Sequence, residues 1–157
     1  MDKMPVHEMT ADKMTVREFN ALVERDLPLA RWLGFSAEAI GEGKATIRLP
    51  FRKDFVRPGG TIAGPAMMAL ADCAMYAAVL GARGDAIMAV TSNLSIHFLR
   101  APKPVDMVAE AELLRMGRRL AVVEVTLYSA GDEKPVAHIA GTYALPSQAS
   151  GEGFAVP

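Results

Sequence analysis

One carboxylate, Asp72, lies in the middle of the most apolar stretch of the chain, residues 63–80. The positions three and four residues away from it hold no cation: they are Met68, Ala69, Met75 and Tyr76. If this stretch is a helix, no neighbour on it can neutralise the acid. Because an unpaired carboxylate is costly to bury, Asp72 needs either a partner from elsewhere in the fold or a chemical role.

Gly64 stands at the expected start of the same helix, just before Pro65. Free backbone N–H groups and the positive end of the helix dipole lie at such a start, where they suit a carbonyl oxygen that gains negative charge. Proline has no N–H, so the Gly64 amide must make this contact. The alternative is a glycine that serves only a tight entry turn.

The rest of the chain predicts the elements that must hold this helix. Thr15 and Glu18 form a capping-box pattern before a helix over residues 16–27, and a second short helix is expected over residues 28–33. The expected strands are residues 35–40, 45–49, 90–99, 105–114, 120–129 and 136–145. A helix that is apolar nearly all round must be covered on most sides. We therefore expect an α+β fold in which one antiparallel sheet wraps the central helix and the last four strands form a meander.

The length and composition indicate one soluble domain. We expect a flexible leader over residues 1–14, a single domain over residues 15–145 and a loose tail over residues 146–157. No apolar run reaches the roughly 20 residues of a membrane span, and the net charge of −1 argues against nucleic acid. The single cysteine, Cys73, fits a reducing compartment. These features predict a cytoplasmic protein with no membrane or nucleic-acid partner.

The sequence contains no motif for a metal site or for a serine hydrolase. The three histidines, His7, His97 and His138, are scattered and have no Cys, Asp or Glu at ligand spacing, so no metal is expected. No Gly-x-Ser-x-Gly elbow occurs. Cys73 points about 100° away from Asp72 on a helix, which favours a core position over a nucleophile.

Residues 57–72, residues 91–100 and the segment from Gly117 to Tyr143 follow one another in a familiar order and spacing. The last segment begins with Gly-Arg-Arg-Leu and ends with Gly-Thr-Tyr. The pattern resembles the hotdog-fold acyl-CoA thioesterases, and within them the PaaI-like (phenylacetate-pathway) group. The resemblance covers most of the chain and implies a hotdog fold. It also implies hydrolysis of an acyl-CoA thioester to a free acid and coenzyme A, with no cofactor beyond the coenzyme A of the substrate.

The resemblance implies a role for several residues. Asp72 takes the position of a general base for water, or of a nucleophile on the thioester carbonyl, and Gly64 that of the oxyanion donor. In similar enzymes these two come from different subunits, which implies a homodimer that can pair further into a homotetramer. Thr91 falls where related enzymes place a hydroxyl that holds the attacking water; an ordinary strand residue is an equal alternative. Asn93 is a second candidate of this kind, expected on the same face.

The chain departs from the usual family pattern at the start of the central helix. That pattern has an Asn, then His-Gly-Gly, with the acid nine residues after the His. Here Ala63 occupies the His position, Pro65 the second Gly position and Arg57 the Asn position. We still expect Ala63 to lie beside the bound substrate, but its methyl group cannot orient the thioester as an imidazole would.

Several arginines are candidates for the phosphates of coenzyme A. Gly117, Arg118 and Arg119 form a basic turn, and a guanidinium group is well shaped for phosphate. Arg57 and Arg100 are further candidates. The alternative for each is an arginine that is simply solvated.

Two other functions stay open from the sequence. A non-catalytic acyl-CoA binding protein of the same fold would explain the missing imidazole. A hotdog dehydratase or hydratase ranks last, because such a site normally shows a His with a Gly-Asp nearby and this sequence has none.

Overall fold

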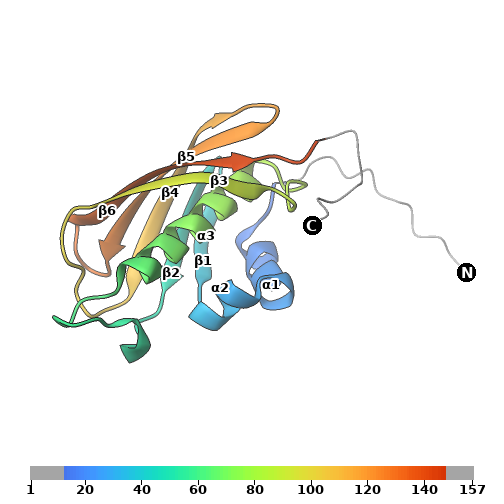
Figure 1. Ribbon diagram of the computed structural model, residues 1–157. Coiled ribbons are helices and arrows are strands. Elements are labelled where there is room, and N and C mark those ends of the chain that lie inside the picture. Colours follow the sequence, from blue (N-terminus) through green and yellow to red (C-terminus); the bar gives the residue numbers. More distant parts are fainter. Residues whose placement is uncertain (1–12, 148–157) are drawn as a thin grey trace, which may run out of the picture.

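The computed structural model describes residues 13–147 (Figure 1). All but the end of the predicted leader, and all but the start of the predicted tail, lie outside the described residues. The helices are α1 (Val16–Asp26), α2 (Pro28–Leu33) and α3 (Gly64–Ala82), and a 3-10 turn, η1, spans Lys53–Phe55. The strands are β1 (Ser36–Gly41), β2 (Lys44–Leu49), β3 (Val90–Phe98), β4 (Met107–Met116), β5 (Leu120–Ser129) and β6 (Pro135–Ala144).

The six strands form one antiparallel sheet that curves around α3, so the predicted α+β arrangement is confirmed (Figure 1). The strand order is β1-β2-β4-β5-β6-β3. The prediction of a four-strand meander is therefore wrong for β3, which pairs with β6 at the far edge instead of with β4. The connection over residues 99–106 contains Pro102 and Pro104, which have no N–H to close a tight hairpin.

The N-terminal helices form where their sequence signals predict. Thr15 caps α1: its Oγ1 accepts a hydrogen bond from the Glu18 amide at 3.2 Å, and Glu18 Oε2 accepts one from the Thr15 amide at 3.0 Å. Gly34 ends α2 in the left-handed region, with φ 83°. This conformation carries almost no steric cost for glycine.

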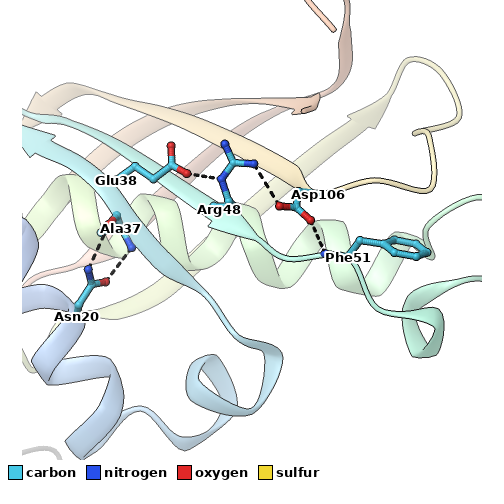
Figure 2. Close-up of polar contacts among 6 residues, drawn as sticks. All are labelled: Asn20, Ala37, Glu38, Arg48, Phe51 and Asp106. Atoms are coloured by element: carbon cyan, nitrogen blue, oxygen red, sulfur yellow. Dashed lines mark hydrogen bonds and ion pairs between the residues drawn. The ribbon is translucent and has the colours of Figure 1, made fainter. Parts of the chain in front are cut away.

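Asn20 ties α1 to the sheet through the backbone of Ala37 in β1 (Figure 2). Its Nδ2 donates to the Ala37 carbonyl at 3.2 Å, and its Oδ1 accepts from the Ala37 amide at 2.8 Å. The turn between β1 and β2 has Glu42 at φ 53° and Gly43 at φ 74°. Positive φ at both central residues is typical of a type I′ hairpin, whose twist matches the strands.

A polar network fixes the chain where it leaves β2 towards α3 (Figure 2). Asp106 Oδ1 accepts a hydrogen bond from the Phe51 amide at 2.7 Å, and its Oδ2 pairs with an Arg48 guanidinium nitrogen at 3.3 Å. Arg48 also pairs with Glu38. Because residues 50–63 lead directly into α3, this network helps to set where the helix begins.

Helix α3 is the centre of the core. Its apolar residues from Ala74 to Leu80 are buried against the sheet, and Phe19 of α1 contacts the ring of Tyr76. By length and composition alone the helix could cross a membrane, but 67% of its apolar window is buried inside the protein. It is therefore the core helix of this fold, and Asp72 is the one acid on it.

Candidate active site

Asp72 has two neutral hydrogen-bond donors. The Thr91 hydroxyl donates to Asp72 Oδ1 at 2.6 Å, and the Tyr143 hydroxyl lies 2.9 Å from the same oxygen. The Tyr143 hydroxyl is also 3.1 Å from the backbone carbonyl of Asp72. Within residues 13–147, no lysine, arginine or histidine forms an ion pair with this acid. The half-buried carboxylate is thus held by hydroxyl groups alone.

The register of the sheet places both hydroxyls on the helix. Thr91, near the start of β3, lies directly opposite Tyr143, near the end of β6. Residues paired in this way point to the same face of a sheet, and here that face packs on α3. The β3–β6 pairing therefore brings both side chains to Asp72 together.

Tyr143 was not a predicted site residue, although it lies at the carboxylate. It is only 3% exposed, and a buried tyrosine hydroxyl usually needs a polar partner. Its ring stacks on Tyr76 at 5.9 Å between centroids, and Tyr76 meets Phe19 edge-on at 6.2 Å. The sequence indicated only that Tyr143 faces inward from its strand. Its contact with Asp72 could not be predicted without knowing that β3 lies beside β6.

The environment of the site keeps its other acidic groups protonated. Burial, together with the charge of Asp72, raises the pKa of Tyr143 far above its ordinary value. Burial and the same charge raise the pKa of Cys73 to about 12. Cys73 is therefore a thiol and not a thiolate near neutral pH, which agrees with its predicted place in the core.

Asn93 does not share the face of Thr91, so this prediction is wrong. The register shifts between Thr91 and Asn93, which places Asn93 opposite Thr142 while Thr91 stays opposite Tyr143. Thr142 and Tyr143 are consecutive and point to opposite faces. A β-bulge has inserted one residue into the strict alternation that the prediction assumed. Asn93 therefore lies on the outer face of the sheet, away from α3.

Gly64 is the first residue of α3, as predicted, and Ala63 is the N-cap without a side-chain hydrogen bond. The N–H of a first helical residue has no acceptor within the helix and is free for a ligand. A Cβ atom on Gly64 would lie 3.4 Å from the ring of Phe98, at the far end of β3 from Thr91. Eight residues of helix, about 12 Å, separate Gly64 from Asp72. One thioester carbonyl cannot contact both within a single subunit.

The predicted arginines fall into two groups at opposite ends of the sheet, all of them exposed. Arg100 Nε donates to the Pro135 carbonyl at 3.1 Å, and the loop that carries Arg57 is held to Pro102 by Thr61 at 3.0 Å. These two lie at the Gly64 end. Gly117, Arg118 and Arg119 form the β4–β5 turn at the Thr91 end, where the Arg119 carbonyl accepts from the Leu145 amide at 2.8 Å. One protomer does not bring the two groups together.

Comparison with known proteins agrees with this architecture. The thioesterase superfamily model matches residues 59–136, a segment that contains Asp72 and Thr91 and ends before Tyr143. A candidate thioesterase from Silicibacter sp. TM1040 is 39% identical, with a TM-score of 0.77 over 88% of this chain and 96% of that one. A point mutant of the phenylacetic acid degradation protein PaaI from Thermus thermophilus is 27% identical, with a TM-score of 0.67 over 76% of this chain and 99% of that one.

A candidate esterase of Saccharolobus solfataricus is 30% identical over 104 residues, which cover 66% of this chain and 74% of that protein. The predicted resemblance to hotdog thioesterases, PaaI proteins among them, is confirmed by these relatives. The sheet wrapped around a core helix that carries one acid agrees with these relatives. This chain therefore belongs to the thioesterase superfamily, whose general activity is hydrolysis of acyl thioesters.

Proposed function

We propose that this protein is an acyl-CoA thioesterase that releases a free acid and coenzyme A, with Asp72 as its catalytic acid–base residue or nucleophile. The observation that carries the proposal is the Asp72 carboxylate, held by Thr91 at 2.6 Å on an apolar core helix. As a general base, Asp72 takes a proton from water while the water oxygen bonds to the thioester carbon. The tetrahedral intermediate then expels the coenzyme A thiolate, which leaves the free acid.

The oxyanion donor in this proposal is the Gly64 amide of a second subunit. β3 is an edge strand with mostly exposed residues, so a second copy can extend the sheet there. In an antiparallel pair of β3 strands, the Phe98 end of one lies beside the Thr91 end of the other. Because Gly64 adjoins Phe98 and Asp72 adjoins Thr91, this pairing supports a composite site between two protomers.

The same antiparallel pairing of two β3 strands would bring the predicted arginines of the two protomers together. Arg57 and Arg100 of one protomer then approach Arg118 and Arg119 of the other, beside Gly117. Guanidinium groups bind phosphate through paired hydrogen bonds, so these residues would hold the nucleotide end of coenzyme A. The acyl group would lie along α3. We place the protein in the cytoplasm as a homodimer or a pair of dimers, acting without a metal or a further cofactor.

The second candidate is an acyl-CoA binding protein without turnover. The observation that favours it is Ala63, which offers no side-chain hydrogen bond at the start of α3. A methyl group cannot help to orient a thioester carbonyl as an imidazole does, so all of the oxyanion contact would fall on the Gly64 amide.

Free-thiol release separates the two candidates. We expect wild-type protein to release thiol from at least one member of an acyl-CoA panel that includes short, long and aromatic acyl groups. The rate should be unchanged by a chelator. Tight binding of the same esters by calorimetry, with no thiol released above the buffer rate, would establish the binding protein and end the hydrolase proposal.

Dilution tests the composite site. If Asp72 and Gly64 act across two protomers, kcat per protomer falls as the protein is diluted below its dimer dissociation constant. Analytical ultracentrifugation over the same concentrations gives the dimer fraction, and the two curves should superimpose. A monomer with full kcat per protomer would show that each site lies within one subunit.

A further inference from the structure

The two carboxylate oxygens of Asp72 have different surroundings. Oδ1 accepts from the Thr91 hydroxyl at 2.6 Å and lies 2.9 Å from the Tyr143 hydroxyl. Oδ2 accepts no hydrogen bond from any residue in the described range 13–147. Two donors occupy the lone pairs of Oδ1, whereas those of Oδ2 are available. Oδ2 is therefore the oxygen able to accept a proton from water or to attack a carbonyl carbon.

Tyr143 is fixed as a donor in this contact. The phenol stays protonated at working pH because burial and the charge of Asp72 raise its pKa far above the ordinary value. Its ring is stacked on Tyr76, with 14° between the ring planes, so the hydroxyl has a set direction. Thr91 is exposed, while Tyr143 is only 3% exposed. Water therefore competes for the Thr91 contact but is kept from the Tyr143 contact, which strengthens the latter.

We propose that Tyr143 is a positioning residue of this site: its hydroxyl holds Asp72 Oδ1 and so turns Oδ2 towards the thioester. The hydroxyl proton is shared between Oδ1 at 2.9 Å and the Asp72 backbone carbonyl at 3.1 Å, which keeps the hydroxyl against this turn of the helix. The inference rests on the proposed function, since it assigns the oxygen through which Asp72 acts.

Tyr143→Phe and Tyr76→Phe form a matched pair of variants. Each removes one hydroxyl from the same aromatic stack, but the Tyr76 hydroxyl donates to the Ile87 carbonyl at 2.7 Å and not to Asp72. We expect Tyr143→Phe to lower kcat by about ten- to a hundredfold, with KM changed less than about threefold. Tyr76→Phe should leave kcat and KM unchanged.

A spectrum that needs no turnover makes the outcomes distinguishable. Carbon-13 labelling of aspartate, with Asp72→Asn to assign the resonance, gives the chemical shift of the Asp72 carboxyl carbon at one fixed, neutral pH. We expect loss of the Tyr143 donor to move this resonance in Tyr143→Phe, whereas it should stay at the wild-type position in Tyr76→Phe. If the wild type hydrolyses no thioester, the proposed function fails while the chemical shift still decides the Tyr143 contact. Equal chemical shifts and equal kcat in the two variants would overturn the inference.

Discussion

Asp72→Asn is expected to lower kcat for thioester hydrolysis by about 10²–10⁴-fold, the usual contribution of a general acid–base residue. Asparagine keeps the shape of aspartate and an oxygen that accepts from Thr91 and Tyr143, so the fold should survive. It loses the negative charge and the basic oxygen, and therefore can neither take a proton from water nor attack the carbonyl. Steady-state thiol release, with KM measured alongside, reports the loss.

Asp85→Asn is the matched control for this variant. Asp85 is exposed and pairs with Arg83 at 3.0 Å, where an ion pair contributes little. Its kcat should equal that of the wild type. An Asp72→Asn protein that keeps kcat within about threefold of the wild type, with an unchanged melting temperature, would remove Asp72 from the chemistry.

The second large effect is expected at Gly141, on the inner face of β6. A Cβ atom there would lie 2.2 Å from Cε of Met75 and 2.8 Å from the backbone carbonyl oxygen of Asn93. Met75 is fully buried and the carbonyl belongs to the bulged part of β3, so neither can move freely. We expect Gly141→Ala to cost about 1–3 kcal/mol in the free energy of unfolding.

That loss corresponds to a fall in Tm of about 2–12 °C for a chain of this size. Calorimetry at fixed protein concentration measures it, because subunit association also shifts Tm. Gly41→Ala is the control: Gly41 is also a strand glycine, but an added Cβ would meet nothing within 4 Å. It should leave Tm unchanged or raise it slightly. Equal Tm values for the two variants would show that the packing around Gly141 yields easily.

Much of the fold could be predicted because its signals are local. The capping box at Thr15, the left-handed Gly34 and the type I′ turn at Glu42-Gly43 each depend on a few adjacent residues. The apolar residues of α3 had to be buried against other elements, and the sheet buries them. The position of β3 was missed because it depends on pairing with β6, which lies far along the chain, and no local pattern records that choice.

The sequence predicted Asp72 and Thr91 as site residues, but it did not predict every side chain that contacts Asp72. Asp72 stood out because no residue at helical spacing could pair with it, and the structure shows Thr91 beside it. Tyr143 could be found only once β3 was known to lie next to β6. Asn93 was misplaced because one inserted residue reverses every later side chain of a strand, and a bulge has no signature in the alternation itself.

The β3–β6 pairing also governs when the site can form as the chain is made. Asp72 and Thr91 leave the ribosome well before Tyr143, and β3 has no neighbouring strand until β6 has been synthesised. Closing such a distant pair is slow compared with forming the local β4–β5 hairpin. The carboxylate thus acquires its buried donor only near the completion of folding. A chain cut short before β6 would expose β3 along both edges and would lack the Tyr143 contact to Asp72.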